Sequence, residues 1–366
     1  MAATEVIICE IGNSDMEVSL SENPWYPEKQ VWVFRAGLDD EYVDTFKSNN
    51  VIGIYWNIEQ DLALVNDWEE LAEISRKAMG LTNSQSIGQN AGMVWRFAYG
   101  MKIDDLVLTH VRSTRSLMLG KVIGDYTFNH VHDGVLKHTR SIEWYDREIL
   151  RDNLSDEMKL KVNTRNTLSR MGLDNAPETV LDTYHGTSVS EQSEVVVNQT
   201  SSVEGLDAEA YLSDLIAQEI SRRFPRYEME RLVEGILQAK GYKTFSPPQG
   251  PDGGVDILAS KGDLGFDTPR ICVQVKSGQT PADRPVLDQL IGTMQNVNAD
   301  QGLLVSWGGF RSSVIREKSK HFFNVRLWDS QDLINEVFNE YDNLPSDIRQ
   351  KLPLKRIWAL DETSNA

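Results

Sequence analysis

Three polar residues in the C-terminal half of the chain have the types and the spacing of a hydrolytic centre. Asp256 is an acid within the otherwise apolar segment Val255–Ala259, and Gln274 and Lys276 lie two residues apart in the segment Ile271–Lys276. Residues two apart in a strand point to the same face of a sheet. If the two segments pair as a hairpin, a carboxylate, an amide oxygen and an ammonium group converge.

Oxygen groups of this kind suit a hard divalent cation. Mg²⁺ is held by one or two carboxylates and keeps several of its waters, so we expect Asp256 and Gln274 to supply part of its coordination. We expect Lys276 to orient or help deprotonate an attacking water and to offset charge on a phosphoryl group. One carboxylate supplies few of the ligands that the ion needs. The preceding segment, a predicted helix, contains further acids. These acids are Glu228, Glu230 and Glu234, within residues 227–239.

The same pieces resemble a known family. The segment 227–242, the turn Asp252-Gly-Gly-Val-Asp256 and the triplet Gln274-Val-Lys276 are similar to the catalytic domain of Mrr-type restriction endonucleases, a branch of the PD-(D/E)xK nuclease superfamily. The resemblance covers roughly residues 225–338. It implies an α/β domain of the restriction-endonuclease-like fold, a mixed sheet flanked by helices, that acts on DNA.

The resemblance also implies a role for each residue. Asp256 matches the motif aspartate and Lys276 the motif lysine. Gln274 matches the position that is Asp or Glu in most of the superfamily but Gln in this branch. Glu230 matches the helix glutamate, so that Asp256, Gln274 and Glu230 would hold Mg²⁺ or Mn²⁺. Asp252, the first acid of the turn, is a weaker candidate, because Asp-Gly-Gly alone is usually only a turn.

The order of elements in this half agrees with such a fold. Short apolar segments alternate with helical periodicity, which is typical of a mixed sheet covered by helices. Strands are expected at 243–245, 255–259, 271–276, 302–305 and 325–328, and helices at 227–239 and about 286–296, 311–320 and 330–339.

The N-terminal half has a different, β-rich pattern. Short apolar runs are punctuated by glycine and Asn-Asn or Asp-Gly pairs, and two helical patterns, Trp68–Met79 and Ile87–Tyr99, interrupt them. A small closed or partly closed barrel with helices packed on it is the economical arrangement. The strand candidates are 31–35, 51–56, 106–110, 117–123, 126–128 and 141–144.

Residues 30–150 are similar to PUA-like barrels of the EVE kind, which recognise modified bases and are found joined to nuclease domains. A base-reading pocket needs aromatic faces and polar edges, because the target base must leave the helix. Tryptophans in a small barrel are more often core residues, and basic residues on strands are usually solvated. The candidate faces are Trp32, Trp56, Trp95 and Tyr126, and the candidate edges include Ser84 and Gln85 in a loop before residue 87. The candidate phosphate contacts are Arg112, Arg115, Lys121 and Arg140.

The net charge of −18 does not exclude a DNA partner, because it is unevenly distributed. Residues 1–23 hold five acids and no base, and residues 171–221 hold ten acids and no base. Residues 24–170 and 222–366 are nearly neutral. Both candidate folded blocks can therefore meet a phosphate backbone through a local basic face, without a large electrostatic contribution to affinity.

Composition and length exclude several other classes. The 366 residues, 40% of them hydrophobic, indicate two to three globular domains. Two cysteines cannot build a disulfide framework or a cysteine-based zinc site, no apolar run approaches the roughly 20 residues of a membrane span, and residues 1–5 lack the basic start of a signal peptide. A cytoplasmic protein is expected.

The predicted organisation is a recognition domain followed by a nuclease domain. The expected segments are an acidic N-terminus at 1–23, an EVE/PUA-like domain at 24–170, an acidic linker at 171–205, a nuclease domain with a leading helix at 206–340 and a C-terminal clasp at 341–366.

We expect a metal-dependent restriction endonuclease that acts on modified DNA. Because one active site cuts one strand at a time, a double-strand break suggests a homodimer or higher homo-oligomer. Two alternatives stay open: a defence-effector or repair nuclease triggered by a small signal or a DNA structure, and a catalytically inactive DNA-binding protein, suggested by Gln274 at the usual carboxylate position.

Overall fold

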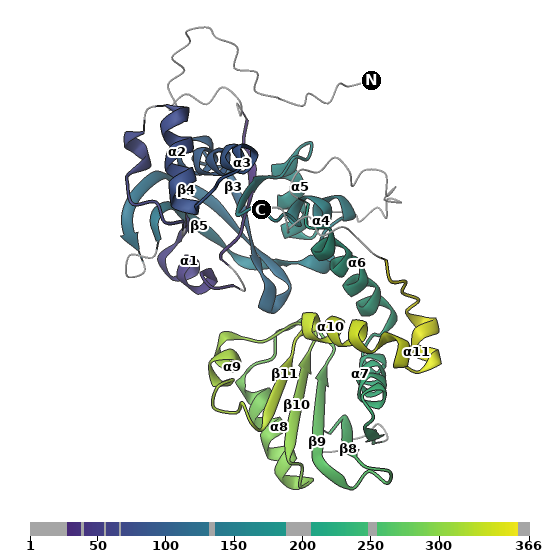
Figure 1. Cartoon of the computed structure of the whole chain (residues 1–366). Coiled ribbons are helices and arrows are strands. Elements are labelled where there is room, and N and C mark those ends of the chain that lie inside the picture. The colour runs from purple at the N-terminus through teal and green to yellow at the C-terminus, as the bar shows by residue number, and fades with distance from the viewer. Residues whose placement is uncertain are drawn as a thin grey trace.

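The structure is a computed structural model of the chain. It describes residues 28–37, 40–54, 56–65, 67–131, 136–187, 206–247 and 255–357. The acidic segment expected at 1–23 lies outside these ranges. The described chain forms an N-terminal domain around a six-stranded sheet and a C-terminal domain around a five-stranded sheet, with helix α6 (Ala208–Arg223) between them (Figure 1).

The N-terminal sheet is open. Its strands are β1 (Val31–Phe34), β2 (Val51–Ile54), β3 (Leu106–Val111), β4 (Ser116–Val131), β5 (Leu136–Leu150) and β6 (Leu168–Arg170). They follow the order β2-β5-β4-β3-β1-β6, and only β1 and β3 pair in parallel. A closed barrel requires its two edge strands to pair. Within the described residues β2 and β6 lie at opposite edges, so the closed form of the expected barrel is wrong.

Strand β4 joins two segments that were expected as separate strands, 117–123 and 126–128. Its register against β5 shifts between Val122 and Tyr126. Gly124 therefore lies in a bulge that bends the strand instead of ending it. A glycine in a sequence is compatible with a turn or a bulge, and only the pairing with β5 distinguishes the two.

Helices cover both faces of this sheet (Figure 1). They are α1 (Val43–Asn49), α2 (Trp68–Met79), α3 (Ser84–Trp95) with a π-helical extension (Arg96–Gly100), α4 (Asp156–Val162) and α5 (Ala176–His185). Alternate residues of β1 join different cores: Trp32 packs with α1 to α3, and Val33 packs with α4 and α5. Helix α2 has the predicted bounds, because Asp67 caps its N-terminus and Gly80 ends it at φ 64°.

Helix α5 falls within the segment expected to be an acidic linker, 171–205. Ala176 and Val180 are buried in the core that covers one face of the sheet, and Gly186 ends the helix at φ 74°. The first part of the expected linker is therefore folded, and further apolar residues of it, among them Leu181 and Tyr184, pack against the same core. Residues 188–205 lie outside the described ranges.

The C-terminal sheet is mixed, as the order of elements predicts. Strands β7, β8 and β9 pair antiparallel, and β9, β10 and β11 pair in parallel, in the order β11-β10-β9-β8-β7. The strands are β7 (Lys243–Phe245), β8 (Ile257–Lys261), β9 (Asp267–Lys276), β10 (Gln301–Ser306) and β11 (Val325–Trp328).

Helices also pack on both faces of this second sheet. Helices α7 (Tyr227–Ala239) and α10 (Ser330–Glu340) cover one face, and α8 (Arg284–Asn296) and α9 (Ser312–Glu317) cover the other. Helix α7 has the predicted bounds. Helix α11 (Ser346–Lys351) docks on α7 at Gly235, where an added Cβ would lie 2.2 Å from Ile348 Cδ1. The segment expected as a clasp thus contributes to the core of this domain.

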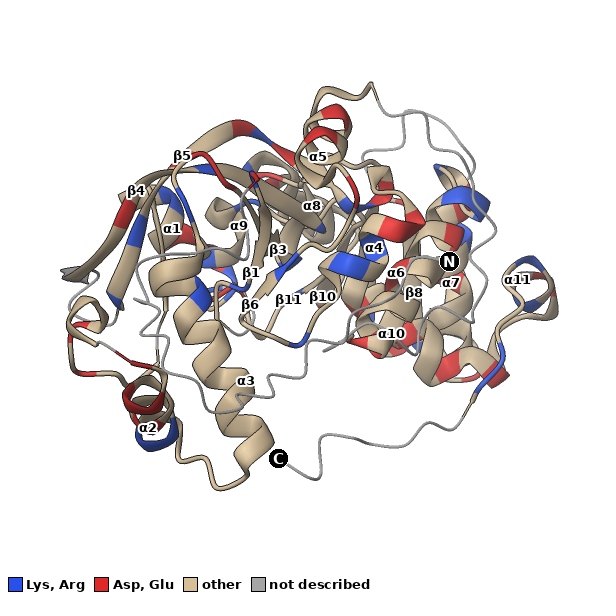
Figure 2. Ribbon diagram, turned by 90° about the horizontal axis from the view of Figure 1, so that it is seen from above, with Lys and Arg blue, Asp and Glu red and all other residues tan. Residues whose placement is uncertain are grey.

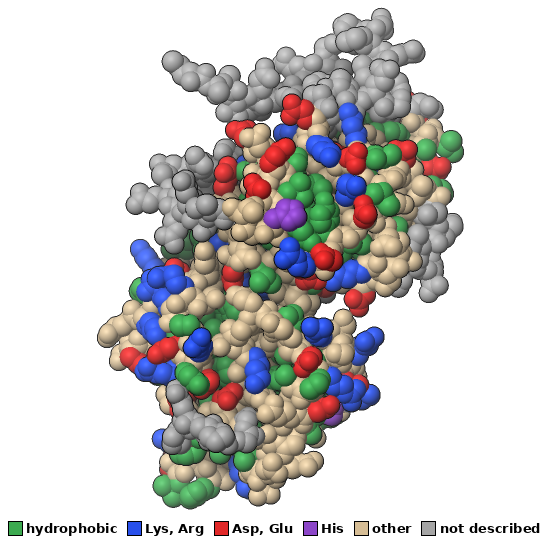
Figure 3. All heavy atoms as spheres, turned by 180° about the vertical axis from the view of Figure 1, so that it is seen from behind, with side chains coloured by type: hydrophobic (Ala, Val, Ile, Leu, Met, Phe, Trp, Pro, Cys, Tyr) green, Lys and Arg blue, Asp and Glu red, His purple; other side chains and the backbone are tan. Residues whose placement is uncertain are grey.

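Charged side chains of both signs are interspersed over both domains (Figures 2 and 3). This agrees with the near neutrality of the two folded blocks. Among the helices that the structure describes, none combines the length and the apolar character needed to cross a bilayer.

Candidate active site

Strand β9 presents alternate side chains to two environments. Val273 and Val275 pack in the core with α7 and α10, whereas Cys272 packs in the core with α8. Gln274 and Lys276 follow Cys272 in the pleat. They therefore lie on the α8 side of the sheet, as their two-residue spacing predicts.

Asp256 lies directly before β8, at the point where this strand begins to pair with β9. Its backbone amide donates to Val273 O at 3.1 Å, and its Oδ2 accepts from the amide of Val275 at 2.6 Å. Burial raises the pKa of Asp256 above its ordinary value, while the Val275 amide and the charge of Lys276 lower it. The carboxylate is thus held beside the end of β9.

Glu230 comes from the other side of the sheet, yet it reaches the same place. It lies in the first turn of α7, and Lys276 is the last residue of β9. Burial and the charge of Asp256 raise the pKa of Glu230 to about 7, and Lys276 opposes the shift. The three charged groups are therefore within electrostatic reach of one another.

Three groups at this edge lack a partner among the described residues. Gln274 is 1% exposed and its Oε1 accepts no hydrogen bond, and neither the Glu230 carboxylate nor the Lys276 ammonium forms a hydrogen bond or an ion pair within the described ranges. Buried polar groups are normally paired, so an orphaned oxygen indicates a missing partner. Two carboxylates and an orphaned amide oxygen are the donor set that a hard divalent cation requires.

The other candidate acids do not join this group. Glu228 forms an ion pair with Lys351 at 2.8 Å, and Glu234 accepts from the Thr244 hydroxyl at 2.8 Å. Asp252 lies outside the described residues. In the part of the chain that the structure describes, no three His, Cys, Asp or Glu side chains gather as a metal site, so the arrangement depends on Gln274 for its third oxygen.

Trp32, expected to stack on a base, is a core residue instead. Its side chain is fully buried and its Nε1 donates to Asp105 Oδ2 at 2.7 Å. Asp105 also accepts from the amides of Gln30 and Lys102. A ring enclosed in this way offers no face to a ligand, so the expectation for Trp32 is wrong.

The other three aromatic candidates are partly buried. Trp56, Trp95 and Tyr126 pack against the core below α1 to α3. The hydroxyl of Tyr126 is already engaged, because it pairs with His138 Nδ1 at 2.8 Å and accepts from the amide of Leu62. Trp56 and Trp95 are partly exposed, and their base-stacking role remains a prediction.

Ser84 and Gln85 form the first turn of α3 rather than a preceding loop. Asn83 caps this helix by accepting from the Gln85 amide at 2.8 Å, which starts the helix three residues earlier than residue 87, the predicted start. Both side chains are exposed, so they remain candidates for polar contacts.

Arg140, one of the four expected phosphate contacts, is buried. Arg140 is 3% exposed and donates to the carbonyls of Phe97 at 2.7 Å and Ala98 at 2.8 Å. Burial lowers the pKa of Arg140 to about 10. Its role is to satisfy the carbonyls of the π-helical turn, and the expectation of a phosphate contact is wrong.

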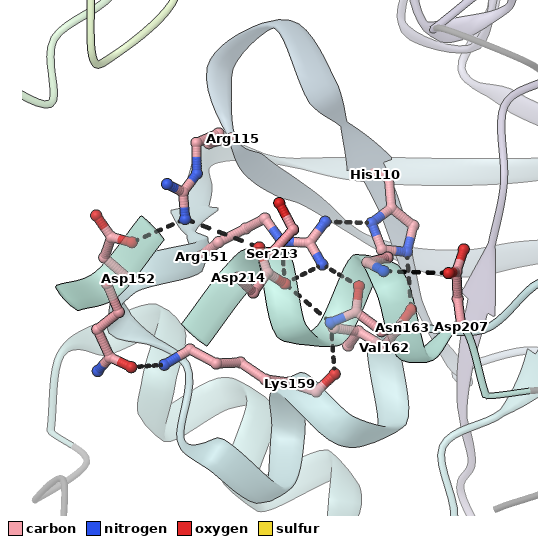
Figure 4. Close-up of polar contacts among 12 residues, drawn as sticks. His110, Arg115, Arg151, Asp152, Lys159, Val162, Asn163, Asp207, Ser213 and Asp214 are labelled. Carbon is pink, nitrogen blue, oxygen red and sulfur yellow. Dashed lines mark hydrogen bonds and ion pairs between the residues drawn. The ribbon is translucent and has the colours of Figure 1, made fainter. Parts of the chain in front are cut away.

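Arg115 also forms its ion pairs within the protein (Figure 4). Its side chain is 12% exposed and lies 3.0 Å from Asp152 and 3.8 Å from Asp214, so a phosphate contact is again excluded in this structure. Arg112 is exposed. Lys121 lies on β4, 3.4 Å from Glu143. The roles of Arg112 and Lys121 remain predictions.

One segment near the site received no role from the sequence. Ser306, the last residue of β10, and the following Trp307-Gly308-Gly309 lie beside the end of β9, and the Trp307 amide donates to Lys276 O at 2.8 Å. The signal in the sequence is a Trp-Gly-Gly directly after an apolar strand, a place where backbone segments approach closely.

Two family models match the chain. Residues 221–337 match the Mrr catalytic family, described as a restriction endonuclease. Residues 32–172 match a domain of unknown function, DUF8426. No curated protein sequence matches this chain.

Two solved structures are similar over 68% of this chain. One is the DNA modification-dependent restriction endonuclease AspBHI, at 12% identity and a TM-score of 0.32, with 67% of that chain covered. The other is the MspJI restriction endonuclease in complex with a 27-mer oligonucleotide, at 14% identity and a TM-score of 0.30, with 64% of that chain covered. This chain thus spans just under two thirds of MspJI.

The family match covers Glu230, Asp256 and Lys276, the charged residues of the candidate site. The match spans the helix that carries Glu230, the start of β8 and the whole of β9. Residues 221–337 therefore form a restriction endonuclease domain of the Mrr catalytic family.

Proposed function

We propose that this endonuclease is metal-dependent and cuts DNA that carries modified bases. The observation that carries the metal assignment is that the Gln274 amide oxygen, the Glu230 carboxylate and the Lys276 ammonium lie unpaired, among the described residues, near the end of β9. In a nuclease domain, these are the groups that would meet the scissile phosphate. Modified DNA as the substrate rests on the likeness of residues 30–150 to EVE-type barrels.

Asp256, Gln274 and Glu230 would hold Mg²⁺ or Mn²⁺. When bound, such an ion polarises a phosphoryl oxygen and lowers the pKa of a water molecule. The Gln274 amide presents a buried oxygen without adding a third negative charge. The Val275 amide keeps Asp256 in place.

Lys276 would orient the attacking water or help to deprotonate it. Its ammonium has no ion-pair partner among the described residues, so it is available to orient a water molecule and to offset the charge of the phosphate. Because Lys276 ends β9, its backbone position follows the strand, which is a more exact support than a loop provides.

The N-terminal domain would read the base. Trp56 and Trp95 keep exposed surface for stacking on an extruded base, and Ser84 and Gln85 are exposed near the start of α3. Arg112 and Lys121 are the remaining phosphate candidates. A double-strand break by one site per chain would require a second copy of the chain on the DNA.

Matched DNA fragments test this proposal. One amplicon is made with ordinary nucleotides, with 5-methyl-dCTP, with 5-hydroxymethyl-dCTP or with N6-methyl-dATP, so that only the modification differs. We expect cutting of a modified fragment with Mg²⁺ and none with EDTA. Lys276→Ala should slow cutting by ~10²–10⁴-fold without changing DNA affinity, whereas Lys243→Ala, on the edge strand β7, should cut normally.

The remaining outcomes separate the alternatives. Equal cutting of every fragment would favour a nuclease triggered by a small signal or by DNA structure. No cutting of any fragment, together with no Mg²⁺ binding by calorimetry, would favour an inactive DNA-binding protein.

A further inference from the structure

The two domains meet at a turn of the N-terminal domain, residues 112–115. The guanidinium carbon of Arg115 lies 5.3 Å from the ring centroid of Trp307, which is 1% exposed. Gly309 approaches the same turn so closely that an added Cβ would lie 1.7 Å from Ser113 O. Because only glycine fits there, backbone meets backbone across the domain boundary.

Residues 306–309, which contact this turn, also contact the end of β9. The Trp307 amide donates to Lys276 O at 2.8 Å, and Ser306 is the register partner of Lys276. Gly308 lies against the backbone of Gln279, where an added Cβ would be 2.5 Å from the carbonyl. The residues 306–309 therefore set the position of the end of β9 and of the segment that follows it.

The N-terminal domain holds this following segment from a second point. Gln279 Nε2 donates to Asp152 Oδ2 at 2.7 Å, and the other oxygen of Asp152 accepts from Arg115 at 3.0 Å. One ion pair of the N-terminal domain thus contacts both the segment after Lys276, at Gln279, and the segment after β10, at Trp307. The contact is charged and directional, so it specifies one relative position of the parts it joins.

The turn itself is rigidly held. Asp40 accepts from the amides of Arg112 and Ser113 at 2.9 and 2.8 Å. On the other side, Arg151 donates to Asp214 of α6 in a buried network with Asn163 (Figure 4). A rigid element pressed against the support of a catalytic residue can transmit its own position to that residue.

We propose that the turn 112–115 is a positioning element for Lys276, acting through Trp307, Gly309 and Gln279. The inference rests on the proposed function. When the N-terminal domain is docked, Lys276 is held in its cutting position, and when the contact is opened the same nuclease domain cuts slowly. Arg115, expected from the sequence to contact phosphate, would serve this purpose instead.

Gly309→Ala tests the proposal, because the added Cβ would clash with Ser113 O and separate residue 309 from the turn 112–115. Its matched control is Gly241→Ala, because Gly241 has nearly the same backbone angle, φ 80° against 76°, but an added Cβ there meets only Lys261 Nζ, at 3.7 Å. The single-turnover rate is measured with enzyme in excess over the modified fragment that the wild type cuts. We expect Gly309→Ala to be ~10- to 100-fold slower at unchanged DNA affinity, and Gly241→Ala to match the wild type.

Trp307→Phe and Trp307→Ala distinguish positioning from general stability. Trp307 Nε1 has no partner in the described residues, so Phe keeps every interaction that the proposal uses and should restore the rate that Ala loses. Amide hydrogen exchange at 277–282 is the second measurement. It should accelerate in Gly309→Ala and not in Gly241→Ala.

Each outcome is decisive. A rate for Gly309→Ala equal to or above that of Gly241→Ala, or unchanged exchange at 277–282, would overturn this inference while leaving the nuclease assignment intact. Failure of the wild type to cut any fragment would instead remove the proposed function, and the exchange measurement would still decide whether the turn holds the segment after Lys276.

Discussion

The carboxylate of Asp256 accepts a hydrogen bond from the backbone amide of Val275, with 2.6 Å between Oδ2 and N. This single contact joins the start of β8 to the residue directly before Lys276. It holds the motif acid beside the residue that precedes the motif lysine on β9. The geometry of the proposed metal site therefore depends on backbone pairing as much as on side-chain chemistry.

Asp256→Asn should abolish binding of Mg²⁺ and Mn²⁺ without unfolding the domain. The new amide oxygen can still accept from Val275, but the negative charge that attracts the ion is lost. Isothermal titration calorimetry with each ion measures the effect. Asp300→Asn is the matched control, because Asp300 also accepts from a backbone amide, that of Arg270. Unchanged Mg²⁺ binding by Asp256→Asn would contradict the assignment.

Gln274→Glu should lower the stability of the metal-free protein and raise its affinity for Mg²⁺. A buried carboxylate without a partner is costly, so the variant should melt at lower temperature than the wild type in EDTA. Saturating Mg²⁺ should then raise its melting temperature by more than it raises that of the wild type, because the ion pairs with the added charge. Gln274→Met, similar in size but without an oxygen, should show the smallest rise. Equal rises in all three proteins would place the ion elsewhere.

Trp32→Phe should destabilise the N-terminal domain and leave base recognition unchanged. The substitution removes the indole donor from buried Asp105, which should cost about 1–3 kcal/mol in urea unfolding. Trp56→Ala should behave in the opposite way, with a small loss of stability and a large loss of discrimination between modified and unmodified fragments. A specificity change in Trp32→Phe at unchanged stability would reverse these two assignments.

Acid should destabilise the N-terminal domain through His110. Arg151 can only donate, so His110 Nδ1 accepts from it at 2.9 Å, while Nε2 donates to Val162 O at 3.0 Å. Burial, together with the charge of Arg151, lowers the pKa of His110 well below its ordinary value. Since the unfolded chain takes up this proton near pH 6.5 and the folded chain does not, stability is full above that pH and falls as the pH drops below it.

Urea unfolding between pH 7.5 and 5 measures this dependence. His110→Gln should flatten the acid side of the curve, because it removes the group that titrates only on unfolding. His185→Gln, an exposed residue that ends α5, should leave the curve unchanged. A His110→Gln curve as steep as that of the wild type would assign the acid sensitivity to another group.

The local patterns in the sequence determined part of the secondary structure and one face of the site. The 3.6-residue period and its caps defined α2 and α7 with their observed bounds. The two-residue period placed Gln274 and Lys276 on one face of β9. These features depend on neighbours within a few residues along the chain, and the sequence records such neighbours directly.

Tertiary structure alone decided which polar and aromatic residues are free to act. Trp32 is enclosed through Asp105, 73 residues away, and Arg140 is used by carbonyls more than 40 residues away. Arg115 is taken by Asp152, Asp214 and Trp307, which come from three separate parts of the chain. A residue type shows what a side chain can bind, but its partner is chosen by long-range packing, because burial removes the competing water and leaves only the groups that the fold brings within reach.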